Sequence, residues 1–275
     1  MKVRIIAAAA LLPLLLVVLI VLPSVFTAIL VGLLCALAAY ELLWATGMVK
    51  ETRLVIYTSV MAFLVALWSY FGGVYAAALL GVIVFTVILF AELMFSHAKP
   101  SFEKMAVCLA GGLLIPFLLS SLVRLRSGYN GQFYVLIPFL IAFLSDSGAY
   151  FAGSFLGKHK LAPQISPKKT VEGAIGGVLT VGLVFAVYAL CYQLVQGTRD
   201  IAFEVNYLYL VIMGIICGVL GIIGDLSASL IKRQFKIKDF GNIMPGHGGM
   251  MDRFDSVLFV APFMMFTLTH LNIFI

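Results

Sequence analysis

The sequence has little charge and no clustered cysteines. Only 11% of its 275 residues are Asp, Glu, Lys or Arg, whereas soluble domains carry about 25%. Its four cysteines lie singly inside apolar runs, which gives no sign of a zinc site or a disulfide framework. The sequence also lacks a GxxxxGK[ST] motif, so a P-loop nucleotide site is excluded. The sequence is therefore dominated by apolar residues.

Hydrophobic residues make up 63% of the sequence, and apolar runs of 18 or more recur along its whole length. Such runs are long enough to cross a bilayer as helices. The first run is longer than the apolar core of a signal peptide, so we expect it to remain as a span. We therefore expect an all-α, polytopic integral membrane protein with about nine transmembrane helices. The expected spans are residues 5–22, 24–45, 54–71, 74–96, 105–123, 132–156, 172–195, 206–231 and 253–273.

The distribution of positive charge predicts the orientation of these spans. Fifteen of the 18 Lys and Arg residues lie in alternate connecting segments that share one side of the membrane. By the positive-inside rule, that side is the cytoplasm, with the N-terminus inside and the C-terminus outside. We expect residues 1–131 to form a scaffold, with a possible dimer contact, and residues 132–275 to form the catalytic region. The catalytic region would carry two cytoplasmic loops, 157–171 and 232–252.

Several acidic residues lie too deep in the expected spans to be ordinary surface charges. An Asp at the centre of a transmembrane helix costs about 2.5–3.5 kcal/mol, so it needs a partner, a cation or a cavity. Asp146 lies in the sixth span among small residues. In the eighth span, Asp225, Ser229, Lys232 and Lys236 have the spacing i, i+4, i+7 and i+11. That spacing predicts one helical stripe, with a carboxylate at the bottom and cations at the rim.

Two loop segments combine charge with glycine or proline. Residues 244–256 read MPGHGGMMDRFDS, and residues 166–177 read SPKKTVEGAIGG. Glycines leave backbone N–H groups free to approach a phosphate, and the neighbouring cations would bind it. The candidate residues are Gly246, His247, Gly248, Gly249, Asp252, Arg253 and Asp255 in the first segment, and Ser166, Lys168, Lys169, Thr170 and Glu172 in the second.

Carboxylates beside cations at one membrane face indicate phosphate chemistry. Oxygen ligands suit Mg²⁺, and a divalent metal would bridge phosphate oxygens while offsetting the desolvation of the aspartates. Phosphoryl or nucleotidyl transfer depends mainly on positioning and charge neutralisation. We therefore expect a phospholipid to react with a water-soluble nucleotide at the bilayer surface.

The run SLIKRQFKIKDFGNIMPGHGGMMDRFD, residues 229–255, resembles the signature of phosphatidate cytidylyltransferases, also called CDP-diacylglycerol synthases. Met244 stands where Leu or Ile is more usual. Residues 146–177 also resemble the family, with Ser147 where Thr is frequent, whereas the first five spans are only generically similar. The charged residues that match the signature are Lys232, Arg233, Lys238, Asp239, His247, Asp252, Arg253 and Asp255.

This resemblance implies an activity and a setting. The expected reaction joins CTP and phosphatidic acid to give CDP-diacylglycerol and pyrophosphate, with Mg²⁺ and with the number of cations left open. The implied location is the bacterial inner (plasma) membrane, with the active site facing the cytoplasm. Family enzymes are implied to be homodimers, with a metal centre at the aspartates matching Asp225 and Asp252. No nucleic-acid partner is expected.

The expected roles follow from the clustering of these residues. Asp225 and Asp252 would bind metal, with Asp255 or Asp146 as further ligands. The catalytic set is Asp225, Asp252, Lys232, Arg233, His247 and Arg253, with His247 positioning a phosphate or the loop. The substrate-binding set is Ser166, Lys168, Lys169, Thr170, Glu172, Ser229, Lys236, Lys238, Asp239, Gly246, Gly248 and Gly249.

Two alternatives stay open on the sequence. Deep charges and proline-interrupted spans also fit a secondary transporter, although the polar residues gather in one half of the bilayer. An enzyme of the same type could act on another lipid, as a polyprenol kinase or an archaeal lipid cytidylyltransferase does.

Overall fold

The computed structural model describes residues 12–72, 75–95, 101–128, 130–197, 206–243 and 248–270. Its chain divides into two compact units. Unit 1 comprises Met1–Val135 and Ile231–Phe254, and unit 2 comprises Leu136–Leu230 and Asp255–Ile275. The unit boundary lies close to the expected division after residue 131, but unit 1 also takes in the segment that contains Asp252.

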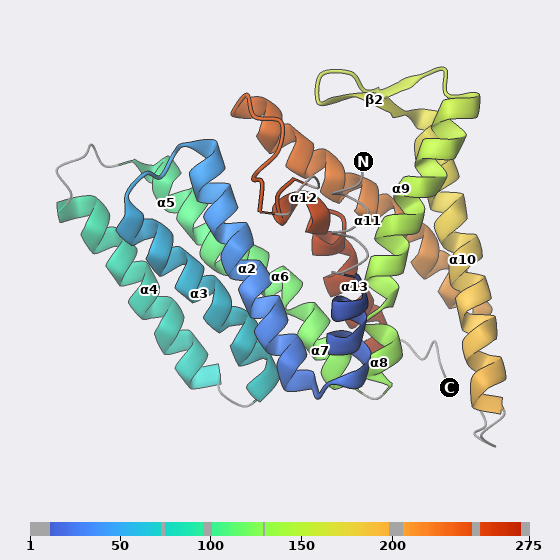
Figure 1. The fold of residues 1–275 in the computed structure, drawn as a ribbon, viewed down its shortest axis with the longest axis horizontal. Coiled ribbons are helices and arrows are strands. Elements are labelled where there is room, and N and C mark those ends of the chain that lie inside the picture. The colour runs from blue at the N-terminus through green and yellow to red at the C-terminus, as the bar shows by residue number, and fades with distance from the viewer. Residues whose placement is uncertain are drawn as a thin grey trace. The chain divides into compact units, whose positions relative to one another are not determined.

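Unit 1 is a helical bundle in which α2 packs along α3 (Figure 1). The two are joined through Gly47, which ends α2 in the left-handed conformation with φ +66°, a backbone that glycine adopts without strain. The elements of unit 1 are η1 (Val17–Val21), α2 (Ser24–Thr46), α3 (Thr52–Phe71), α4 (Tyr75–Phe95), α5 (Phe102–Leu109), η2 (Ala110–Leu114), α6 (Ile115–Leu119), α7 (Ser121–Ser127), α8 (Gly131–Tyr134) and α12 (Met251–Phe254).

The π-helical turn η2 interrupts the helical segment that runs from α5 to α7. Pro116 follows η2, and a proline cannot donate the backbone hydrogen bond of a regular helix at its position. Within η2, Gly112 faces α3 and α4, where an added Cβ would come 2.8 Å from the Phe85 ring. The irregular turn thus lies where the backbone packs closely on its neighbours.

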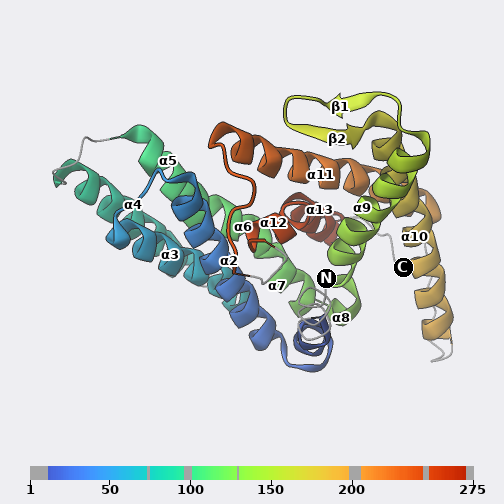
Figure 2. The same ribbon diagram turned by 45° about the horizontal axis from the view of Figure 1, so that its top comes forward.

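Unit 2 consists mainly of long helices and one short ribbon (Figure 2). Strands β1 and β2 pair antiparallel, with Lys160 opposite Thr170 and Ala162 opposite Ser166. This ribbon lies in the segment 157–171 that the sequence predicted only as a loop. The elements of unit 2 are α9 (Ile137–Leu156), β1 (Lys160–Ala162), β2 (Ser166–Thr170), α10 (Val171–Gly197), α11 (Tyr207–Gln234, through Leu230) and α13 (Val257–His270).

Helices α9 and α10 approach each other through small residues. A Cβ at Gly176 would overlap Ala152, and a Cβ at Gly173 would come 2.8 Å from the Ala149 carbonyl oxygen. Small residues on facing helices allow this close backbone contact inside a membrane. The contact fixes where the ribbon emerges, because α9 ends just before β1 and α10 begins just after β2.

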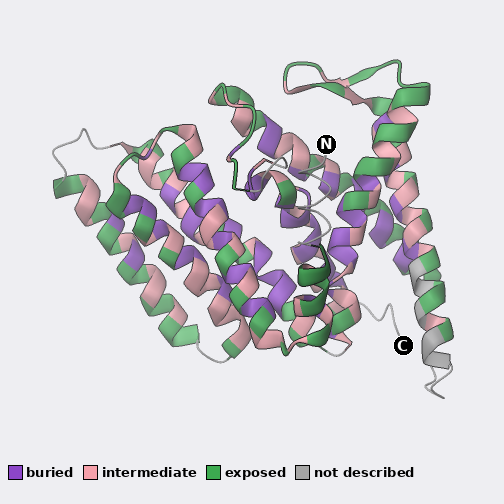
Figure 3. Ribbon diagram, in the orientation of Figure 1, coloured by how far each residue is buried: buried purple, intermediate pink, exposed green. Residues whose placement is uncertain are grey.

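Membrane character is evident from both length and exposure. Within the part of the chain that the structure describes, six helical segments are long and apolar enough to cross a membrane: Ser24–Thr46, Thr52–Phe71, Tyr75–Phe95, Phe102–Ser127, Gly131–Leu156 and Tyr207–Gln234. Figure 3 shows that α4 carries few buried residues, whereas α2 carries many. The apolar side chains exposed on α4 are those expected of a lipid-facing helix. The all-helical membrane prediction is therefore confirmed at this level.

The α9–α10 contact yields a stability prediction. Gly176→Val should lower the thermal unfolding temperature, since the new side chain must displace Ala152, and overpacking costs about 1–3 kcal/mol. The measurement is thermal unfolding of purified protein in detergent. Gly182→Val is the matched control on the same helix, because a Cβ at Gly182 meets nothing within 4 Å. Equal shifts for both variants would contradict the proposed packing.

Candidate active site

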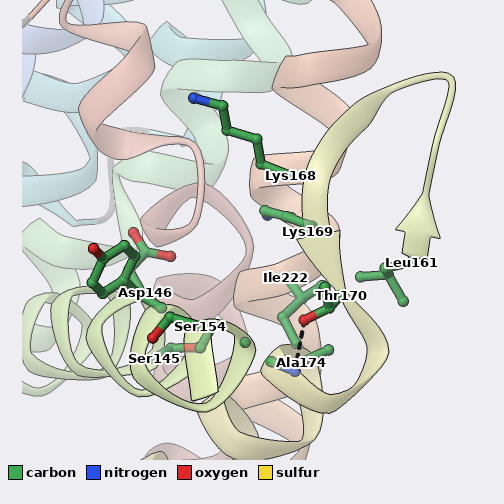
Figure 4. A pocket seen from close by; sticks show the side chains of 13 residues that line it. Ser145, Asp146, Ser154, Leu161, Lys168, Lys169, Thr170, Ala174 and Ile222 are labelled. Atoms are coloured by element: carbon green, nitrogen blue, oxygen red, sulfur yellow. Dashed lines mark hydrogen bonds between the residues drawn. The ribbon is translucent and has the colours of Figure 1, made fainter. Parts of the chain in front are cut away.

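A pocket of about 370 Å³ opens in unit 2 between α9, the ribbon and α11. Figure 4 shows Ser145 and Asp146 of α9 on one side and Lys168, Lys169 and Thr170 of β2 on the other. Much of the remaining wall is apolar or glycine, including Ala149, Leu161, Gly173, Ala174 and Ile222. The pocket therefore offers two cations and a carboxylate within a largely apolar lining.

Asp225 pairs with the strand that forms this pocket. The ammonium of Lys169 makes a salt bridge with Asp225 Oδ2, and the Ser229 hydroxyl donates to Asp225 Oδ1 at 3.4 Å. Asp225 follows Ile222, a pocket residue, by one helical turn on α11. The predicted stripe from Asp225 to Ser229 is confirmed as one face of this helix.

The stripe does not continue to Lys236. Helix α11 ends at Gln234, and Lys236 has a left-handed backbone with φ +56°. The Lys236 N–H donates to the Arg233 carbonyl, and the Ile237 N–H donates to the Lys232 carbonyl. These two bonds form a helix-ending motif that satisfies the last carbonyls. The prediction that Lys236 extends the helical stripe was wrong for this reason.

Thr170 and Glu172 organise the base of the ribbon. The Thr170 hydroxyl accepts from the Gly173 N–H at 3.1 Å, which satisfies one of the unpaired donors at the start of α10. The Glu172 carboxylate accepts from the backbone N–H groups of Lys158 and His159 and contacts the His159 ring at 2.6 Å. Glu172 thus ties the end of α9 to the start of α10, in addition to its predicted place near substrate.

In unit 1, Asp252 is the centre of a second polar cluster. Its Oδ1 accepts from Lys232 Nζ at 2.6 Å, and its Oδ2 accepts from the N–H groups of Phe240 and Gly249 at 2.8 and 3.1 Å. The side chains of Asp252 and Lys232 are only 6% and 12% exposed. Three donors therefore compensate a carboxylate that is almost fully removed from solvent.

The segment around Asp252 depends on glycine at one position in particular. Gly248 has φ +86°, and a Cβ there would lie 3.4 Å from Asp252 Oδ2. A positive φ is strained for other residues. The sequence-predicted need for glycine in this segment is confirmed at Gly248.

Comparison with known proteins identifies the family. The profile of the cytidylyltransferase family matches residues 2–271. The chain belongs to the cytidylyltransferase family. It is 35% identical to the phosphatidate cytidylyltransferase of Staphylococcus haemolyticus, over 86% of this chain and 87% of the relative. It is 36% identical to that of Staphylococcus epidermidis, over 83% and 85%. With the phosphatidate cytidylyltransferase of Bacillus subtilis it is 44% identical over about half of each chain, 50% and 48%.

The residues predicted for the site of this cytidylyltransferase fall into both units. Gly246 and His247 lie outside the described residues. Those in unit 2 are Asp146, Ser166, Lys168, Lys169, Thr170, Glu172, Asp225, Ser229 and Asp255, and those in unit 1 are Lys232, Arg233, Lys236, Lys238, Asp239, Gly248, Gly249, Asp252 and Arg253. The convergence of Asp225 and Asp252 on one metal ion stays a prediction, since the two residues belong to different units.

Carboxylates of the cytidylyltransferase provide the donor chemistry that magnesium requires. Among the described residues, no three His, Cys, Asp or Glu side chains come together as a metal-binding group. Mg²⁺ needs only one or two carboxylates when water and substrate phosphates supply the other oxygens. Asp146 at the pocket and Asp225 beside Lys169 are donors of this kind. The residues of unit 2 therefore fit a magnesium ion that binds together with a phosphate substrate.

One acidic residue that contacts the Asp252 segment was not among the predicted site residues. Glu41 of α2 is 1% exposed, and its Oε2 accepts from the Met251 N–H at 2.9 Å. The available signal was an acidic residue inside an otherwise apolar run. Sequence spacing could not connect it to a segment about 200 residues further along the chain.

The Lys232–Asp252 pair yields a second stability prediction. Lys232→Met should leave Asp252 with its two backbone donors and lower the free energy of unfolding by about 3–5 kcal/mol. Thermal unfolding in detergent measures this change. Lys238→Met, at an exposed position of the same segment, is the control and should leave the unfolding temperature nearly unchanged. A Lys232 variant as stable as the control would show that the pair contributes little.

Proposed function

We propose that this membrane cytidylyltransferase transfers the cytidylyl group of CTP to phosphatidate, giving CDP-diacylglycerol and pyrophosphate. The observation that carries the proposal is the pocket of unit 2, where two lysines and Asp146 lie in an otherwise largely apolar lining. A membrane lipid that ends in a phosphate monoester is complementary to this pocket, because its phosphate is anionic and its body is apolar. The relatives named phosphatidate cytidylyltransferase, similar over most of the chain, support the same acceptor.

The pocket suits the acceptor phosphate for electrostatic reasons. Lys168 is exposed and Lys169 is half-buried, so both ammonium groups can meet a phosphate that arrives from the bilayer surface. Lys169 is held by Asp225, which places its charge beside the pocket. We propose that the phosphate takes over part of this contact when it binds, because ammonium groups bind phosphate strongly.

The proposed chemical step is a nucleophilic displacement at phosphorus. An oxygen of the phosphatidate phosphate attacks the α-phosphorus of CTP, the bond from that phosphorus to the bridging oxygen breaks, and pyrophosphate leaves. The nucleophile is already anionic near neutral pH, so no general base is required. Bound Mg²⁺ would supply charge neutralisation to the phosphate oxygens, with Asp225 and Asp146 of unit 2 as ligands and Asp252 and Asp255 as further proposed ligands.

The cations of unit 1 are proposed to bind the triphosphate. Arg233, Lys238 and Arg253 are exposed, so their side chains can reach a water-soluble nucleotide. The Lys232 ammonium is engaged with the Asp252 carboxylate. We assign Lys232 to holding the Asp252 segment in the resting enzyme, which would keep the backbone N–H groups of that segment ordered.

The alternatives differ in their support. Membership of a nucleotidyltransferase family favours an enzyme over a secondary transporter. Another lipid phosphate or alcohol would need the same cations and the same apolar approach, so the acceptor itself must be tested.

We further propose nine spans, a cytoplasmic N-terminus and an external C-terminus, in the plasma membrane with the active site facing the cytoplasm. Besides the six long helices, the described residues form three shorter apolar helices at Leu12–Val21, Val171–Val187 and Val257–His270. These helices overlap the remaining three spans expected from the sequence, which supports the proposal. A homodimer is proposed from the family resemblance alone.

Purified protein incubated with labelled CTP, Mg²⁺ and phosphatidate should form labelled CDP-diacylglycerol and release pyrophosphate in equal amounts. Diacylglycerol and polyprenol or its phosphate serve as competing acceptors and should give little product. Asp225→Asn should lower kcat on the order of 100-fold or more, because a charge that stabilises the transition state is lost.

The control for that experiment is Glu92→Gln, which removes a carboxylate near the end of α4 that lies 3.8 Å from exposed Arg53. It should retain nearly full activity. Preferred use of another acceptor, or counterflow across liposomes without nucleotide turnover, would reject the proposed reaction. Full Mg²⁺-dependent activity of Asp225→Asn would reject its role.

The proposed topology is tested with C-terminal fusions. An alkaline phosphatase fused after residue 275 should be active, because this reporter folds outside the cytoplasm, whereas a green fluorescent protein there should stay dark. An odd number of spans with the N-terminus inside requires this result. A fluorescent C-terminal fusion would mean an even number of spans or the opposite orientation.

A further inference from the structure

Glu41 is a fully buried acid near the C-terminal end of the otherwise apolar helix α2. Its side chain lies on α2 and is 1% exposed, and its Oε1 has no hydrogen-bond partner among the described residues. Burying a carboxyl group with an unsatisfied oxygen is costly. An apolar residue would pack against the same helices at lower cost, so the carboxyl group needs a reason other than core stability.

The contacts of Glu41 are with the backbone that leads into Asp252. Its Oε2 accepts from the Met251 N–H at 2.9 Å. A Cβ at Gly241 would lie 2.5 Å from Oε1, and a Cβ at Gly249 would lie 2.6 Å from Oε2. The two glycines therefore admit the carboxyl group between two stretches of backbone.

The same backbone holds the Asp252 carboxylate. Gly249, which packs against Glu41, donates its N–H to Asp252 Oδ2, and Phe240, next to Gly241, donates to the same oxygen. Met251, which donates to Glu41, directly precedes Asp252. One acid from α2 thus contacts the backbone whose N–H groups donate to the other acid.

We propose that Glu41 is a positioning residue of the active site, which sets the backbone at Gly241, Gly249 and Met251 and thereby the orientation of Asp252. This inference rests on the proposed function, in which Asp252 belongs to the catalytic set. Glu41 acts through the peptide backbone and touches no substrate. The hydrogen-bond acceptor at Oε2 carries the role.

Replacement at position 41 tests the proposal. Glu41→Ala removes the acceptor and should lower kcat per folded protein by about 10- to 100-fold, the usual range for residues that orient a functional group, with KM for CTP changed less than about threefold. Glu41→Gln keeps a carbonyl oxygen for the Met251 N–H at the same length. It should therefore restore kcat to within about threefold of the unchanged protein.

A second measurement does not depend on catalysis. Hydrogen–deuterium exchange of peptides covering residues 240–252 should be faster in Glu41→Ala and near normal in Glu41→Gln, because the Met251 N–H loses its acceptor only in the first. Gly241→Ala should mimic Glu41→Ala, since its Cβ displaces the carboxyl group. Thr58→Val changes another fully buried polar side chain of unit 1 and should alter neither measurement.

The outcomes are separable. An inactive unchanged protein refutes the proposed function, whereas the exchange measurement still tests whether Glu41 orders the segment. Normal kcat in Glu41→Ala, or faster exchange with unchanged kcat per folded protein, overturns the positioning role. Loss of activity in Glu41→Gln equal to that in Glu41→Ala overturns the claim that the acceptor alone is needed.

Discussion

A carboxylate buried among apolar helices must be compensated, and this constraint governs the polar part of the molecule. Asp252 is satisfied by an ammonium and two backbone donors, and Asp225 is satisfied by Lys169 and Ser229. Each set of donors includes a residue of α11, Lys232 or Ser229, together with donors from a connecting loop or strand. The acids therefore hold the connecting segments in place through the donors that balance them.

Close packing of α9 on α10 positions the ribbon that carries the two lysines of the pocket. The small residues of α9 and α10 bring the two backbones together, and the ribbon between them carries Lys168 and Lys169 to the pocket. Glu172 and Thr170 then stiffen the base of that ribbon through backbone hydrogen bonds. In a membrane, where apolar side chains gain little by leaving lipid for protein, such packing and hydrogen bonding are the forces that fix geometry.

Much of this architecture could be predicted from the sequence. Long apolar runs predicted the helices, and the spacing of Asp225 and Ser229 predicted their common face, because both depend only on local helix geometry. The prediction that this face extends to Lys236 was wrong, because hydrogen bonds to the carbonyls of Lys232 and Arg233 end the helix before it. The ribbon at 160–170 was missed because its strands are short and carry no clear alternation.

The sequence by itself determined the membrane class, the family and the chemical character of the two charged segments, since composition, run length and motif are properties of the linear chain. Only the tertiary structure decided which donors meet which acids. Glu41 and Met251 are separated by most of the chain. Lys169 and Asp225 lie on a strand and a helix, and no spacing in the sequence indicates that they meet. Such pairs arise because folding brings distant backbone and side-chain groups together wherever burial leaves a charge that must be satisfied.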